Sequence, residues 1–211
     1  MENNASLKSN LIHSYNNHAQ ERDAYKIEDW KAEERANFLS LLQSKGKRTI
    51  LEIGAGTGRD SKFFQDMGMD VTCIDMSPEM IKFCQQKGLS AHVMDMTNLD
   101  FPPDSFEAVY SLNSLLHIPK DEFRIVLENV KRVLTPSGLF YLGVYGADEE
   151  EFEDVWEKDS YNPKRFFSFK TDESIQKITS EIFELLYFKP IMVSGNNHLH
   201  FQSLILEKPD L

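Results

Sequence analysis

Three glycines fall within five positions in residues 51–60, LEIGAGTGRD, directly after an apolar run. Glycine weakens regular structure, so a cluster of glycines indicates a tight turn or a ligand that must approach the backbone. A helix is predicted over residues 59–67, and its first turn would present unpaired N–H groups and a partial positive charge to an anion. The loop of Gly54, Gly56 and Gly58 therefore predicts an anion-binding turn between a strand and a helix.

Two carboxylates end later predicted strands. Asp75 ends residues 70–75 and lies 21 positions after Gly54, close to the ~20 positions expected of a carboxylate that binds a ribose. Asp95 ends residues 90–95. Ligands of open α/β sheets bind at the carboxyl ends of the strands, near the point where the strand order reverses. The loop and the two acids together predict a ligand with a ribose, an adenine-like ring and an anionic end.

Strands and helices alternate along most of the chain, as apolar periodicity and turn residues predict. The predicted strands are residues 48–54, 70–75, 90–95, 106–113 and 139–145. The predicted helices are residues 28–43, 59–67, 119–134, 168–183 and one that begins at Ser77-Pro78 and ends at Gly88. Alternation of this kind favours parallel strands that are joined by right-handed crossovers.

The last two predicted strands, residues 184–193 and 198–208, are separated only by SGNN. So short a link cannot hold a crossover helix, and this pair is therefore predicted to be antiparallel. The predicted fold class is α/β, with a mostly parallel seven-stranded sheet that carries a C-terminal antiparallel hairpin.

Length and charge limit the possible functions. A chain of 211 residues favours one domain, and its formal charge of −11 argues against a nucleic-acid partner. No apolar stretch approaches the ~20 residues of a membrane helix, and the polar N-terminus lacks the apolar middle of a signal peptide. We therefore expect a cytoplasmic protein without a membrane partner; its oligomeric state is not predicted. Cys73 and Cys84 lack CxxC spacing and are interpreted as reduced, buried thiols, and the acidic residues 147–159 as a solvated helix or loop face.

Two cofactors fit the predicted ligand. A nicotinamide dinucleotide site requires G-x-G-x-x-G, but Arg59 occupies the position of the last glycine. The pattern here, E-x-G-x-G-x-G, resembles the first motif of the class I S-adenosylmethionine (SAM) methyltransferases, whose loop faces a methionine carboxylate. The segments VTCIDMSPEMI, MDMTNLDFPPDSFEAVYS, FEAVYSLNSLLHI and VLTPSGLFYLGVY resemble later parts of that family in the same order, so the likeness covers roughly residues 12–208.

The resemblance implies a Rossmann-like three-layer sandwich with SAM as cofactor and S-adenosylhomocysteine (SAH) as product. It assigns the ribose hydroxyls to Asp75, the adenine ring to Met76 and Met96, and the adenine amino group to Asp95. The other cofactor-binding positions that it implies are Gly54, Ala55 and Gly56 of the loop and Ser111 of the fourth strand. Residues 1–45 are then expected to form a helical lid, and residues 46–211 the cofactor-binding domain.

Four polar side chains have two interpretations each. Glu52 orients the loop amides or contacts the cofactor, and Arg59 pairs with the methionine carboxylate or is a surface charge. Tyr15 closes over the sulfonium end of the cofactor or is a surface tyrosine of a helix. His117, after the fourth strand, is a general base or substrate contact or has a structural role.

Residues 161–169, YNPKRFFSF, follow the fifth strand, where the family inserts substrate-contacting elements. Arg165, Phe166 and Phe167 are expected to contact an aromatic or anionic acceptor, although core packing explains the phenylalanines equally well. His198 and His200 lie two positions apart, but the sequence shows no third ligand, so no metal site is predicted.

The expected function is transfer of a methyl group from SAM to a small molecule. The N/D-P-P-Y/F block that marks methylation of DNA or of protein glutamine is absent, because the fourth strand continues into SLNSLLHI. Two alternatives stay open: a SAM-binding sensor or partner subunit without catalysis, and a methyltransferase that acts on protein or RNA. The acceptor atom and the need for a general base are not predicted.

Overall fold

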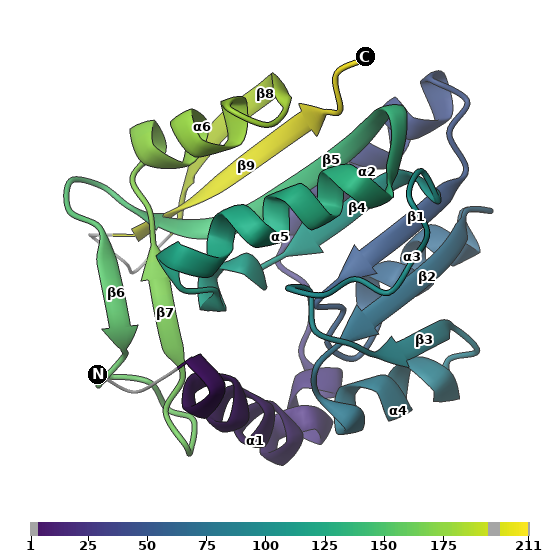
Figure 1. Cartoon of the computed structure of the whole chain (residues 1–211). Coiled ribbons are helices and arrows are strands. Elements are labelled where there is room, and N and C mark those ends of the chain that lie inside the picture. The colour runs from purple at the N-terminus through teal and green to yellow at the C-terminus, as the bar shows by residue number, and fades with distance from the viewer. Residues whose placement is uncertain (1–3, 194–198, 211) are drawn as a thin grey trace.

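A seven-stranded sheet forms the centre of the molecule, which a computed structural model describes for residues 4–193 and 199–210. The strand order is β3-β2-β1-β4-β5-β9-β8 (Figure 1). The strands are β1 (Thr49–Ile53), β2 (Asp70–Asp75), β3 (Ser90–Val93), β4 (Phe106–Leu112), β5 (Leu134–Ala147), β8 (Glu184–Met192) and β9 (Leu199–Glu207). Strands β1 to β5 pair in parallel, and β9 pairs antiparallel with both β5 and β8. The predicted fold class and its C-terminal hairpin are therefore confirmed.

Helices cover both faces of the sheet and complete three layers. The helices of the structure are α1 (Asn4–Ala24), α2 (Asp29–Ser44), α3 (Arg59–Asp66), α4 (Pro78–Gln86), α5 (Lys120–Val133), α6 (Asp172–Ser180) and the short 3-10 helix η1 (Leu115–His117), of which all but α1 and η1 pack beside the sheet faces. Side chains alternate between the faces of a strand. Ile50 and Tyr110 accordingly lie in the cluster that includes α2 and α3, whereas Leu51 and Val109 lie in the cluster that includes α5.

Local sequence explains where two of these helices begin. Ser77 caps α4, because its side chain accepts a hydrogen bond from the Met80 N–H at 3.2 Å, and Pro78 takes the first helical position. Thr171 caps α6 in the same way, by accepting from the Ser174 N–H at 3.2 Å. The predicted start of α4 is therefore confirmed. The predicted start of α6 at residue 168 is wrong, because the preceding residues form a strand.

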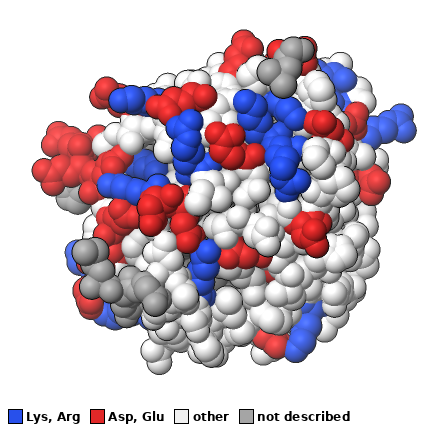
Figure 2. Space-filling model, viewed as in Figure 1, with Lys and Arg blue, Asp and Glu red and all other residues white. Residues whose placement is uncertain are grey.

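A second, two-stranded sheet was not predicted. Strands β6 (Phe152–Val155) and β7 (Phe166–Phe169) pair antiparallel beside the carboxyl ends of β4 and β5 (Figure 1). Residues 148–154 are exposed, as predicted for the acidic segment, but their second half is strand and not helix or loop. Figure 2 shows their acidic side chains gathered at the left edge of the molecule, where the chain turns from β5 into β6.

Helix α1 lies apart from the sheet faces. It crosses the end of the sheet to which the parallel strands point, between α4 on one side and β7 on the other (Figure 1). In the described ranges, no helix combines the length and apolarity that a membrane span requires. Cys73 and Cys84 are buried between β2 and α4 and form no disulfide.

Candidate active site

The glycine loop joins β1 to α3 through three residues with positive φ, namely Gly54 (70°), Gly56 (55°) and Gly58 (78°). A Cβ on Gly54 would lie 2.2 Å from Cβ of Ser114, so this glycine allows the loop to pack against the segment after β4. A Cβ on Gly56 would meet no atom within 4 Å. The loop therefore turns tightly against the protein at Gly54 and faces open space at Gly56.

Asp75, at the end of β2, fixes this loop in place. Its Oδ2 accepts a hydrogen bond from the Gly56 N–H at 2.9 Å, and its Oδ1 accepts one from the Ser77 N–H at 2.8 Å. Burial raises the pKa of Asp75, although these two N–H groups favour its charged form. Each carboxylate oxygen can accept a second hydrogen bond, so Asp75 retains capacity to bind a ligand.

Two cavities meet at the glycine loop. The first is lined by Leu11, Ile12, Tyr15, Arg22, Gly54, Gly56, Asp75, Met76, Ser77, Met96, Leu112, Asn113, Ser114 and His117. The second is larger and more open, and it extends from the same loop to the α1–α2 connection, Tyr145, Arg165 and Phe167. Because four of its lining residues belong to α1, the first cavity is covered by this helix.

His117 lies at the junction of the cavities and is held as a neutral imidazole. Its Nδ1 donates to the carbonyl oxygen of Phe166 at 2.7 Å, because a carbonyl can only accept. Its Nε2 consequently accepts from the Tyr15 hydroxyl, 2.7 Å away. Burial is the main reason that the pKa of His117 is lowered to about 3; the nearby Arg165 and Arg22 also lower this pKa, whereas the hydrogen bond to the Phe166 carbonyl opposes the shift. The lone pair of this histidine is therefore available only where Tyr15 now binds.

Arg165 supports the Tyr15 hydroxyl from the other side. Its Nη1 donates to that hydroxyl at 3.1 Å, while Nε and Nη2 donate to the two oxygens of Asp159 at 2.9 and 2.8 Å. The guanidinium also lies 3.7 Å from the centre of the Tyr161 ring. A fork of this kind fixes the orientation of an arginine better than a single contact does. Asp159 therefore positions Arg165, and Arg165 positions Tyr15.

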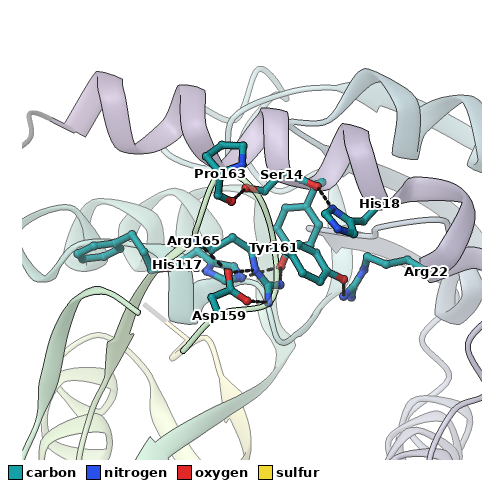
Figure 3. Close-up of polar contacts among 10 residues, drawn as sticks. Ser14, His18, Arg22, His117, Asp159, Tyr161, Pro163 and Arg165 are labelled. Atoms are coloured by element: carbon teal, nitrogen blue, oxygen red, sulfur yellow. Dashed lines mark hydrogen bonds and ion pairs between the residues drawn. The ribbon is translucent and has the colours of Figure 1, made fainter. Parts of the chain in front are cut away.

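The same segment holds α1 over the first cavity. Figure 3 shows Ser14, His18 and Arg22 of α1 facing Pro163 and Tyr161. The Ser14 hydroxyl donates to the Pro163 carbonyl, and Arg22 donates to the Tyr161 hydroxyl at 3.2 Å. The His18 ring stacks on the Tyr161 ring, with 3.9 Å between their centres. These contacts join α1 to residues 161–165 without involving the main sheet.

Known methyltransferases resemble this chain in sequence. Residues 50–138 match the family model described as a methyltransferase domain. Glycine N-methyltransferase of Rattus norvegicus is 27% identical over 161 residues, which cover 67% of this chain and 53% of that protein. These matches support a class I S-adenosylmethionine-dependent methyltransferase. A probable phthiotriol/phenolphthiotriol dimycocerosates methyltransferase of Mycobacterium ulcerans is 37% identical over 101 residues, 45% of this chain and 38% of that protein. The chain thus matches about half the length, or less, of these curated methyltransferases.

Two solved structures show the shared methyltransferase fold. The first, 1,6-didemethyltoxoflavin-N1-methyltransferase of Burkholderia thailandensis, has a TM-score of 0.76 at 22% identity and covers 98% of this chain and 88% of that one. The second, N-methyltransferase NodS of Bradyrhizobium japonicum WM9, has a TM-score of 0.72 at 17% identity and covers 95% and 100%. At these identities the likeness shows the fold alone.

Most of the residues predicted for a methyltransferase site come together at the two cavities. Those that line one or both are Tyr15, Glu52, Gly54, Ala55, Gly56, Arg59, Asp75, Met76, Met96, His117 and Arg165. Glu52 is bonded by the Ser61 hydroxyl of α3, and no loop amide bonds to its carboxylate in the described structure. Arg59 donates to the backbone carbonyl of Arg22 at 3.1 Å.

Three predicted residues line neither of these cavities. Asp95 accepts from the Thr97 N–H at 2.8 Å and pairs with Lys8 of α1 at 3.0 Å. Burial raises the pKa of Asp95, but these two partners outweigh it and hold the pKa below its usual value. Ser111 is buried and shares a hydrogen bond with Ser114 at 2.5 Å, so it supports the turn beside Gly54. Phe166 contributes its carbonyl to His117, and its neighbour Phe167 lines the second cavity in its place.

Arg22 and Asn113 were not predicted, yet both line both cavities. Arg22 lies seven residues after Tyr15, which is two turns of a helix, so the two side chains share one face of α1. The spacing from Tyr15 could therefore have indicated Arg22 as a site residue. The Asn113 side-chain oxygen is buried without a hydrogen-bond partner in the described structure, and its backbone has a positive φ of 56°. Nothing local in the sequence indicates this conformation.

His200 serves a separate cluster. Its Nδ1 lies 2.8 Å from a carboxylate oxygen of Asp148, and its Nε2 lies 2.6 Å from one of Asp172. Burial lowers the pKa of His200, but the two carboxylates outweigh it and raise the pKa above its usual value. His198 lies outside the described residues. Within the described ranges, no group of three possible ligands could hold a metal ion.

Proposed function

We propose that this chain transfers a methyl group from SAM to a small-molecule acceptor. The observation that carries this proposal is the meeting of two cavities at Gly54 and Gly56, one reaching Asp75 and the other reaching Arg165. One cavity suits a nucleoside under α1, and the other suits an acceptor. The glycine loop between them is where the transferred group would pass.

The residues at the loop fit this cofactor. Asp75 retains one free acceptor position on each oxygen, which matches the two hydroxyls of a ribose. Met76 and Met96 line the same cavity and offer apolar surfaces to a purine. A Cβ at Gly56 would project into open space, so glycine leaves room for a ligand beside the backbone. We assign the carboxylate of the cofactor to the loop and to Arg22 or Arg59.

When bound, SAM supplies a methyl group on a positively charged sulfur. The protein has to align the acceptor and exclude water, and alignment of this kind can lower a barrier by ~7–11 kcal/mol. We propose that α1 is the lid, because it covers the first cavity through Leu11, Ile12, Tyr15 and Arg22. Helix α2 packs on the sheet through Phe38 and Leu42, so we place the lid boundary before it and not at residue 45.

We propose that His117 orients the acceptor. An acceptor hydroxyl or amine that replaces the Tyr15 hydroxyl at Nε2 would donate its hydrogen bond to a neutral nitrogen. Because burial lowers the pKa of His117 to about 3, this histidine is a weak base and stays neutral at neutral pH. Its role in this proposal is therefore to aim the nucleophile, and Arg165 and Phe167 contact the rest of the acceptor.

Calorimetry with Asp75→Ala tests the cofactor site. The chain should bind SAH but not NAD, and Asp75→Ala should lose about 1–3 kcal/mol of SAH affinity, roughly 5- to 150-fold. Asp70→Ala is the matched control, because Asp70 lies on the same strand and is exposed at its far end. Tight NAD binding without SAH binding would overturn the proposal.

A binding protein without catalysis is the second candidate, since the same cavities would serve a SAM sensor. Incubation with methyl-labelled SAM and a metabolite extract separates the two functions. Labelled small molecules support transfer. SAH binding without any labelled product supports the sensor.

A further inference from the structure

One wall of the second cavity is positively charged. Arg22, Lys26 and Arg59 line it, from the end of α1, the α1–α2 connection and the start of α3. None of the three forms an ion pair with a carboxylate in the described structure, although the whole chain has a formal charge of −11. Arg22 instead donates to the Tyr161 hydroxyl and Arg59 to the Arg22 carbonyl, so no carboxylate of the described residues neutralises the three cations, and a bound anion would supply the opposite charge.

The carboxylates of this cavity are already engaged or neutral. Asp60 pairs with Arg35 at 2.5 Å, and Glu28 pairs with Lys31 at 2.5 Å. Glu52 is buried, and burial raises its pKa well above the usual value. The negative groups that line the cavity therefore do not offset the three cations.

The proposed cofactor does not balance this charge either. SAM carries one carboxylate against an ammonium group and a sulfonium, so its net charge is positive. Its carboxylate can pair with one of the three cations, most directly Arg22, which also lines the first cavity. Lys26 and Arg59 are then left facing the space in which an acceptor would lie.

Apolar and aromatic side chains also line the same cavity. They are Leu112 at the end of β4, Leu116 of η1, Tyr145 of β5 and Phe167 of β7. Aromatic and aliphatic walls of this kind favour the body of a small organic molecule, while a few polar groups set its orientation. The cavity therefore offers apolar surface to the body of a molecule and cations to an anionic group.

We infer that the acceptor is a small anionic molecule, with an apolar or aromatic body and a carboxylate or phosphate held by Lys26 and Arg59. This inference rests on the proposed function, because it treats the second cavity as the acceptor site. Electrostatic attraction between this wall and the anion also draws acceptors of the correct charge to the cavity. Neutral analogues of the same shape are then disfavoured, because they leave the two cations without an anionic partner.

Binding to the SAH-saturated protein tests the inference with probes that differ only in charge. Phenylacetate and its neutral amide, phenylacetamide, have nearly the same shape, and phenyl phosphate represents the phosphate alternative. Ligand-observed NMR and calorimetry measure the affinity of each probe. We expect both anions to bind at least tenfold more tightly than the amide, with a preference that falls as salt rises. The tighter of the two anions identifies the acidic group.

Two variants locate the anion. Lys26→Gln and Arg59→Gln should each reduce the preference for acid over amide at least threefold, measured at saturating SAH. Lys177→Gln is the matched control, because Lys177 is exposed on α6 and lines neither cavity. Equal affinity for acid and amide, or an unchanged preference in both variants, overturns the inference. A protein that does not bind SAH at all overturns the proposed function instead, so the two failures are distinguishable.

Discussion

The attachment of α1 can be weakened at Tyr161 without touching the sheet. Tyr161→Ala removes the ring that stacks on His18 at 3.9 Å and the hydroxyl that Arg22 bonds at 3.2 Å. An aromatic contact contributes ~0.5–1.5 kcal/mol and a hydrogen bond ~0.5–1.5 kcal/mol, so the lid should lose about 1–3 kcal/mol. The contact between Arg165 and the same ring is not counted, because both residues stay together when α1 moves away.

Hydrogen exchange measured by mass spectrometry reports this loss of stability in α1. Opening of α1 should become roughly 5- to 150-fold more frequent, and its amides should exchange faster by that factor, whereas β1 keeps its rates. Tyr161→Phe retains the ring and should show a smaller effect, roughly 2- to 13-fold. Tyr25→Ala, an exposed tyrosine just after α1, is the control. Unchanged exchange in α1, or equal acceleration in β1, would refute the view that these contacts hold a separate lid.

Three further substitutions test a separate histidine cluster, the glycine loop and the Arg165 ion pair. His200 has a raised pKa, so its stabilising contribution is present below its unfolded pKa of ~6.5 and is lost as pH rises through the folded value. His200→Gln should therefore cost about 1–2 kcal/mol in urea unfolding near pH 6 and much less near pH 9, while the exposed His92→Gln changes little. Gly58→Ala places a Cβ 2.7 Å from Leu89 at a φ of 78°, and urea unfolding should show a loss of about 2–4 kcal/mol; a loss below ~1 kcal/mol would contradict the packing. Asp159→Asn leaves Arg165 without its carboxylate and should cost about 2–4 kcal/mol at low and high salt alike, because both side chains are largely buried; strong salt dependence would argue against a buried pair.

The main sheet could be predicted because each of its strands has its own apolar run and its own flanking turn. The short SGNN link also fixed the direction of the last pair. Strands β6 and β7 were missed for a physical reason. Residues 152–155 carry acidic groups and little β-branched surface, so their strand conformation depends on pairing with β7. The FFSF of β7 is followed closely by α6. No glycine or proline marks the point at which the strand pattern changes to the helix pattern.

The site residues also differ in whether local sequence could predict them. The glycine loop and Asp75 were visible because a backbone conformation and a strand end are local features. The pairing of Asp95 with Lys8 was not, because it requires α1 to lie against a residue 87 positions further along the chain. Arg22 falls between these cases. Its position on the same helix face as Tyr15 could be predicted from the sequence, but the cavity that both residues line could not.

The position of β9 has a consequence for biosynthesis. This strand lies between β5 and β8, although it is synthesised after both of them. A growing chain that already contains the glycine loop and Asp75 therefore has an open β5 edge until translation has passed residue 207. An open edge of this kind can pair with other chains. Nascent molecules thus depend on β9 to cover an edge that is open as soon as β5 has been made.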